Sequence, residues 1–212
     1  RSKELGGVPA LMRLLQQYDG EGPGPFAPPF LRHEGFVLAQ VANILHYLGP
    51  LLGLAPSDER ARHQALQLQL TVADVVADVH DTHHPVGTGL YYEDQKPESL
   101  RRSEQFVEHR IPKYLGYFER TLERAGQPCV VGGVHSYVDL SLFQLVEGLR
   151  YAFPTAMGAF TAKMPLLLEV HARVAARPNV AAYLASPRRI AFNEQGIFRR
   201  YPELDLRPTW AT

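Results

Sequence analysis

The segment Gly133-Val134-His135-Ser136-Tyr137-Val138-Asp139, followed by the apolar run 140–149, decides the fold class of this chain. Ser136 can accept a hydrogen bond from the third backbone N–H of a helix, and Asp139 can reach back to the backbone N–H of Ser136. This capping box satisfies donors that a helix start otherwise leaves without partners. Because apolar side chains cover a wide arc of the following run, we expect this helix to lie at the centre of a helical core.

Long helical patterns surround this segment. Ser57 is placed to cap a long helix whose apolar residues repeat every three or four positions. A second long helix is predicted over 97–125, ended by Gly126 and kinked at Pro112. Further helices are predicted over 136–152, 165–177 and 178–185, before an extended tail. Residues 56–212 are therefore predicted to form an all-helical domain.

The first fifty residues have a mixed α/β pattern. A helix is predicted over 8–16, extended segments over 28–32 and 36–38 with a tight turn through Gly35, and a helix over 39–48 that Gly49-Pro50 ends. Such a small sheet buries too little surface to fold alone. Residues 1–50 must therefore be completed by the downstream helices or by further strands.

Composition excludes several classes of partner. The 212 residues carry 22 Lys plus Arg and 22 Asp plus Glu, so the formal net charge is zero, without the basic excess typical of proteins that bind nucleic acid or anionic membranes. No apolar run approaches the roughly 18 residues that span a bilayer. Cys129 is the only cysteine, which rules out a disulfide within the chain and favours a cytoplasmic location.

The Gly-x-x-Ser-x-x-Asp box, placed after two long helices and an α/β segment, resembles the C-terminal domain of glutathione S-transferases. The stretch Pro28-Pro29-Phe30-Leu31, the turn at Gly35 and residues 38–48 are similar to the second half of that family's thioredoxin-like domain. The likeness covers nearly the whole chain. It implies a partial α/β thioredoxin-like domain at 1–50 and an all-α domain at 56–212, predominantly helical overall.

The resemblance also implies a glutathione-binding site. Pro29 corresponds to the family's cis-proline, Phe30 offers its backbone to the cysteinyl part of glutathione, and Gln40 contacts the γ-glutamyl end. Val41 stands where the family has serine or threonine, so the hydroxyl that binds the γ-glutamyl carboxylate is missing. The Val41 backbone N–H at a helix start is still available to that carboxylate.

The function that the resemblance implies is transfer of glutathione, as co-substrate, to a small hydrophobic electrophile by a homodimeric enzyme. The family's N-terminal β-α-β segment, which carries the activating Tyr, Ser or Cys, does not occur in this sequence, so the catalytic residue is unknown. A non-catalytic module of the same fold, used for binding or assembly, is the rival hypothesis. Both Val41 and the missing segment favour that rival.

The cluster His80-Asp81-Thr82-His83-His84 has three interpretations. In the family the corresponding helix lines the substrate cleft, so we assign His80, His83, His84 and the nearby loop residue Tyr91 to that cleft. Alternatively, the cluster is a polar helix end where imidazoles suit the helix dipole, and Tyr91 packs on its own domain. Binding of a metal by His80 and His84, four residues apart, is a third interpretation that we do not adopt.

Overall fold

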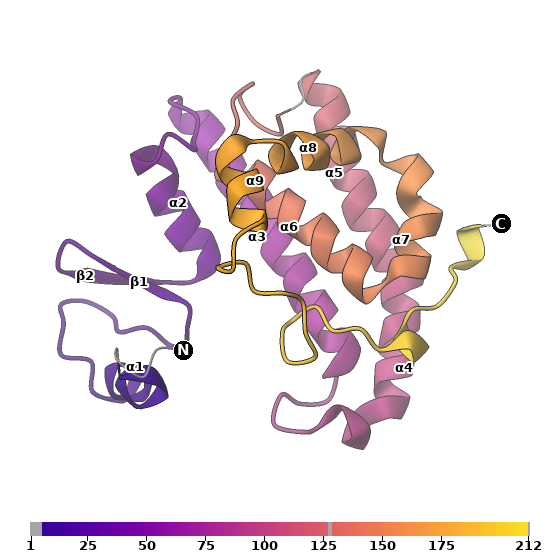
Figure 1. The fold of residues 1–212 in the computed structure, drawn as a ribbon, viewed down its shortest axis with the longest axis horizontal. Coiled ribbons are helices and arrows are strands. Elements are labelled where there is room, and N and C mark those ends of the chain that lie inside the picture. The colour runs from indigo at the N-terminus through magenta and orange to yellow at the C-terminus, as the bar shows by residue number, and fades with distance from the viewer. Residues whose placement is uncertain (1–5, 127–128, 212) are drawn as a thin grey trace.

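A computed structural model describes residues 6–126 and 129–211, in which helices surround a core and a two-stranded sheet lies at one side (Figure 1). The antiparallel sheet pairs Phe30 with Ala39 and His33 with Phe36. Its two-residue turn, Glu34 and Gly35, has φ values of 46° and 87°, the left-handed geometry that matches the twist of a hairpin. The N-terminal elements are α1 (Gly7–Gln16), β1 (Phe30–His33), β2 (Phe36–Ala39) and α2 (Val41–Leu51).

The remaining helices confirm the predicted all-α half. Helix α6 is the central one and packs against α2, α3, α7 and α8. None of the helices within the described ranges has the length and apolar character needed to cross a membrane. The elements are α3 (Glu59–His83), η2 (Tyr92–Gln95), α4 (Lys96–Gln105), η3 (Phe106–Arg110), α5 (Ile111–Ala125), α6 (Tyr137–Ala152), α7 (Pro154–Phe160), η4 (Thr161–Lys163), α8 (Pro165–Ala175), α9 (Pro178–Leu184), η5 (Pro202–Leu204) and η6 (Thr209–Ala211).

The predicted capping box of α6 is present. Asp139 Oδ2 accepts hydrogen bonds from the backbone N–H of Ser136 at 2.7 Å and from its hydroxyl at 2.9 Å. Asp139 Oδ1 accepts from the backbone N–H of Val130 at 3.1 Å, a contact that the sequence did not predict. One carboxylate, 1% exposed, therefore fixes both the start of α6 and the loop before it.

Two predicted helix boundaries are wrong. Asp58, not Ser57, caps α3, because its carboxylate accepts from the Ala61 N–H at 2.8 Å in the positive field of the helix start. Helix α2 continues through Gly49 and Pro50 to Leu51. A Cβ at Gly49 would lie 2.6 Å from Tyr137 Cδ1. Gly49 therefore allows α2 to approach α6 closely and does not end the helix.

The 97–125 helix is interrupted close to Pro112, where the sequence predicts a kink. A π-helical turn, Phe106–Arg110, joins α4 to α5 just before Pro112. Proline has no N–H for the carbonyl four residues earlier, which belongs to Glu108. The indole Nε1–H of Trp210 donates to this Glu108 carbonyl at 3.1 Å, so the C-terminal tail replaces the missing bond.

Helix α7 was not predicted from the sequence. The backbone N–H groups of Thr155 and Ala156 in its first turn donate to the carboxylate of Asp205 at 2.9–3.2 Å. Since this cap comes from the C-terminal tail, no local pattern around the helix start could reveal it.

Replacing Asp139 with alanine should destabilise the protein far more than replacing the other capping aspartate. Asp139→Ala removes three buried charge-assisted bonds, so we expect the free energy of unfolding to fall by about 3 kcal/mol or more. Asp58→Ala removes one exposed cap and should cost about 1 kcal/mol. Urea unfolding followed by circular dichroism measures both, and equal losses would contradict the central role of Asp139.

Candidate functional site

A cavity of about 730 Å³ lies where the N-terminal α/β segment meets the helical half. Its volume suits a ligand of drug size, and most of its lining is apolar, as in small-molecule sites. From the N-terminal side it is lined by Phe26, Ala27, Pro28, Pro29, Ala39, Gln40, Val41, Ala42, Asn43 and His46. From the helical side it is lined by Leu66, Gln69, Leu70, Val72, Ala73, Val76, Ser141, Ile197 and Phe198.

Three of the four predicted glutathione-binding residues, Pro29, Gln40 and Val41, line this cavity. The peptide bond between Pro28 and Pro29 is cis, as the resemblance predicts for this position. Phe30 follows as the first residue of β1, and its side chain is not part of the lining. The structure thus brings Pro29, Gln40 and Val41 to a single cavity that apolar residues of α3 also line.

The backbone at Gln40 is unusual. Gln40 has φ 69° and ψ 119°, a conformation that non-glycine residues rarely adopt and that is found at ligand-binding positions. Helix α2 begins at the next residue, and the side chain of Gln40 does not cap it. The backbone donors of its first turn are therefore open to an anionic group entering the cavity. Val41, at 48% exposure, stands at this helix start.

Gln69 is a polar residue in the α3 wall that the sequence analysis overlooked. Its side chain is 3% exposed, and its Oε1 atom has no hydrogen-bond partner among the described residues. A buried polar atom without a partner is costly, and a ligand in the cavity can supply one. The available sequence signal was a glutamine four residues after Ala65, on the apolar face of the predicted helix.

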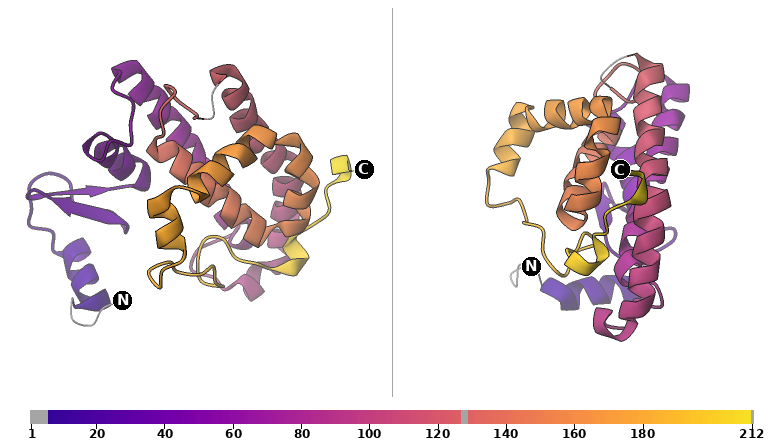
Figure 2. Two further views of the ribbon diagram at one scale, coloured as in Figure 1. Left: turned by 45° about the horizontal axis from the view of Figure 1, so that its top comes forward. Right: turned by 90° about the vertical axis from the view of Figure 1, so that its right-hand side faces the viewer.

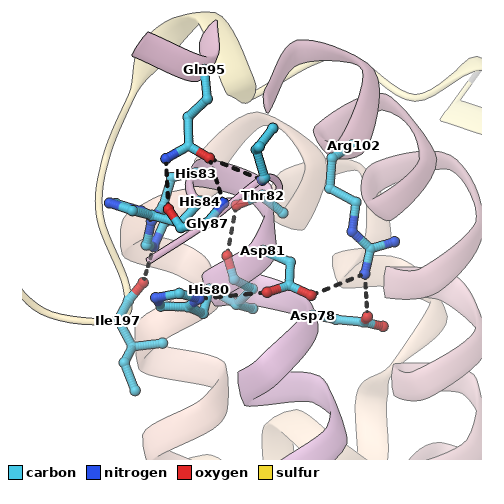
Figure 3. Close-up of polar contacts among 12 residues, drawn as sticks. Asp78, His80, Asp81, Thr82, His83, His84, Gly87, Gln95, Arg102 and Ile197 are labelled. Carbon is cyan, nitrogen blue, oxygen red and sulfur yellow. Dashed lines mark hydrogen bonds and ion pairs between the residues drawn. The ribbon is translucent and has the colours of Figure 1, made fainter. Parts of the chain in front are cut away.

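The histidine cluster lies at the other end of α3 (Figure 3). His83 is 1% exposed, and its Nε2 contacts the carbonyl of Ile197 at 2.8 Å. A carbonyl only accepts, so His83 Nε2 carries the proton, and its Nδ1 accepts from His84 Nδ1 at 2.5 Å. Burial first, and then the charges of Arg199, His84 and His80, lower the pKa of His83 to about 4. His83 is therefore neutral at pH 7.

His80, His83, His84 and Tyr91, the residues assigned to the substrate cleft, do not line this cavity. His83 contacts one of the lining residues, Ile197, through a hydrogen bond. Tyr91 is 78% exposed, so it is not packed on its own domain either, although its backbone N–H bonds to Asp94. The residues that line the cavity from α3 lie nearer the start of that helix.

Neither the rings nor the nearby acids of this cluster are arranged around a metal. The rings of His80 and His84 are stacked, with centroids 5.3 Å apart and planes at 27°. Asp78 accepts hydrogen bonds from Arg102, Arg110 and Tyr114. Burial raises the pKa of Asp78, but these bonds and charges outweigh it and lower the pKa overall. Within residues 6–126 and 129–211, His, Cys, Asp and Glu form no metal-binding group of three.

The buried His83 should make stability depend on pH. Its pKa is 6.5 when unfolded and about 4 when folded, so the unfolded chain binds more protons between these values. Stability should therefore fall as the pH drops from 6.5 toward 4, by at most about 1.4 kcal/mol per pH unit from this residue. His83→Gln keeps a donor for Ile197 but does not titrate. Thermal unfolding should show a shallower pH dependence for this variant, and identical slopes would contradict a neutral buried His83.

Comparisons with known proteins agree with this architecture. Residues 80–187 match the family model for the C-terminal domain of glutathione S-transferase. A glutathione S-transferase from Plasmodium yoelii yoelii is 26% identical over 161 residues, which cover 74% of this chain and 67% of that protein. Glutathione S-transferase P from Capra hircus is 29% identical over 165 residues, covering 76% and 70%.

Solved structures show the same fold. The glutathione S-transferase Blo t 8 superposes with a TM-score of 0.65 at 19% identity, over 83% of this chain and 74% of that one. The prostaglandin synthase D of Nilaparvata lugens gives 0.63 at 18% identity, over 78% and 76%. Because the family model spans half of the residues and the fold agrees, this chain belongs to the glutathione S-transferase family.

Proposed function

We propose that this chain binds glutathione and joins its thiol to a small hydrophobic electrophile. The observation that supports this most is that Pro29, Gln40 and Val41 share one cavity with the apolar wall of α3. The backbone donors at the start of α2 suit a charged tripeptide, and the apolar residues of α3 suit the second substrate. A single space that holds both places the sulfur beside the atom it attacks.

Glutathione would be held mainly by backbone groups. The backbone of Phe30, in the edge strand that follows Pro29, pairs with the cysteinyl part as one strand pairs with another. The γ-glutamyl carboxylate lies at the start of α2, where the first backbone N–H groups and the helix dipole favour an anion. Gln40 then contacts the γ-glutamyl end from its constrained backbone position.

The reaction requires an ionised thiol. Glutathione loses its thiol proton, and the thiolate sulfur attacks the electrophilic carbon, forming a C–S bond while the leaving group departs with the displaced electron pair. A hydroxyl or a positive dipole near the sulfur lowers the thiol pKa and so supplies more thiolate. The residue with this role is not among those that the resemblance carries onto this sequence. The described residues bind and orient the two substrates.

We also propose that the protein acts as a homodimer in the cytoplasm. Phe26 is 92% exposed and Leu70 is 51% exposed, and both border the cavity. Large exposed apolar side chains close together are typical of surfaces that a partner covers. Sedimentation of the wild type and of Phe26→Ser tests this, because loss of an interface contact shifts the variant toward the monomer.

The rival function is a non-catalytic module that binds or assembles without turnover. Val41 favours this rival, because the hydroxyl that the family uses for the γ-glutamyl carboxylate is absent. Calorimetry with glutathione, combined with an assay in which the thiol displaces an absorbing aryl halide, separates the two functions. Binding with turnover supports the enzyme, and binding without turnover supports the module. No binding at millimolar glutathione would refute our proposal.

Restoring a hydroxyl at position 41 should tighten glutathione binding. Val41→Ser adds one hydrogen bond to a carboxylate, which is worth about 1.5–3 kcal/mol, or roughly a 10- to 150-fold lower Kd. Val41→Ala is the matched control, since it shortens the side chain without adding a hydroxyl and should leave the Kd close to that of the wild type. Calorimetric titration compares the three proteins. Equal gains in both variants would show that side-chain size, not the hydroxyl, limits binding.

A further inference from the structure

One face of α6 holds the C-terminal tail. After α9 the chain runs as an extended tail back to the end of the bundle that contains α4 (Figures 1 and 2). Arg189 donates to Gln144 at 3.1 Å, and the ring of Phe192 stacks on Tyr151 with centroids 4.9 Å apart. The residues of α6 that face the cavity or the tail recur at helical spacing and form one stripe: Ser141, Gln144, Gly148 and Tyr151.

Gly148 is the point of closest approach between this stripe and the tail. A Cβ at Gly148 would lie 2.5–2.6 Å from the ring of Phe198, closer than real side chains pack. Because Gly148 is in the middle of α6 and has an ordinary helical backbone, only this contact requires a glycine there. The ring of Phe198 therefore occupies the space that a side chain at position 148 would fill.

The tail is fixed on both sides of Phe198. The preceding residue, Ile197, accepts the hydrogen bond from buried His83 at 2.8 Å. Three residues later, Tyr201 stacks on Tyr92 with ring centroids 3.8 Å apart and planes at 15°. Ile197 and Phe198 are the residues through which the tail lines the cavity. The Phe198 ring itself contacts Gly148 and, edge to face, the ring of Phe192, with centroids 6.2 Å apart.

We propose that Phe198, seated on Gly148, determines the largest apolar group that the cavity accepts. This inference rests on the proposed function and adds the residue pair that sets its selectivity. Apart from the loop 26–29 before β1, the other apolar walls belong to helices and to the hairpin, whose backbones are held by their own hydrogen bonds. The tail wall is an aromatic side chain on an extended segment. Its size and seating therefore limit how far an apolar group attached to the glutathione sulfur can extend.

A series of S-alkyl glutathiones, from methyl to octyl, tests this by calorimetric titration. Each methylene that enters the cavity should lower the Kd about fourfold, until the chain meets Phe198. The alkyl length at which the Kd no longer falls is the stopping length. In Phe198→Ala the gain should continue for at least two more methylenes. In Gly148→Ala the new methyl displaces the ring from α6 into the cavity, so the gain should stop at a shorter chain than in the wild type.

Ile190→Ala is the matched control, because Ile190 lies in the same tail, is 78% exposed and is outside the cavity lining. It should leave the stopping length unchanged, and a shift equal to that of Phe198→Ala would show a general loosening of the tail. Phe198→Leu, which keeps an apolar side chain on Gly148, should give an intermediate length. Melting temperatures confirm that each variant is folded.

Failure of this inference and failure of the proposed function give different results. If glutathione binds and the stopping length is the same in the wild type, Phe198→Ala and Gly148→Ala, the inference is overturned while the function stands. If unsubstituted glutathione does not bind, the proposed function fails, and the variants are titrated with a small and a large apolar fluorescent dye. Phe198→Ala must then gain affinity for the large dye over the small one, and an equal change for both would overturn the inference.

Discussion

The carboxylate of Asp139 is the interaction on which the rest of the structure depends. It holds Ser136 and Val130 through three buried hydrogen bonds, at a place where an unpaired donor or acceptor would be costly. Helix α6 starts from this point, and the backbone N–H of Tyr137 donates to the carbonyl of Leu54 at 2.9 Å. The start of α6 is therefore joined directly to the turn after α2, and the cavity lies between the N-terminal segment, α3, α6 and the tail.

The parts of the structure that could be predicted from the sequence are those whose causes are local. The capping box and the hairpin turn each depend on residues within a few positions of one another. The parts that were missed depend on remote partners. Asp205 caps α7 from about fifty residues away, and Trp210 bonds to a carbonyl in the π turn. A pattern of neighbouring residues contains no trace of such contacts.

The histidine cluster illustrates a different limit of sequence reasoning. Three histidines within five positions indicate chemistry, because imidazole binds metals and transfers protons near neutral pH. Burial decides which of these properties remains. His83 is enclosed and neutral, and its Nε2–H holds the tail at Ile197. The residue types were visible in the sequence, but burial depends on how α3 meets the tail.

The N-terminal side and the helical side of the cavity are built by different means, so substitutions affect the two sides differently. On the N-terminal side, ligand binding relies on backbone groups, namely the start of α2 and the constrained conformation of Gln40. A side-chain difference such as valine at position 41, where the family has serine or threonine, changes this side of the cavity by one hydrogen bond. The helical side relies on side chains, and the ring of Phe198, in the tail, packs against a single glycine, Gly148. Backbone donors suit a ligand that stays the same, whereas a wall of side chains can be reshaped by one substitution without disturbing the fold. A co-substrate common to all reactions and a variable second substrate would favour this division into backbone donors on one side and side chains on the other.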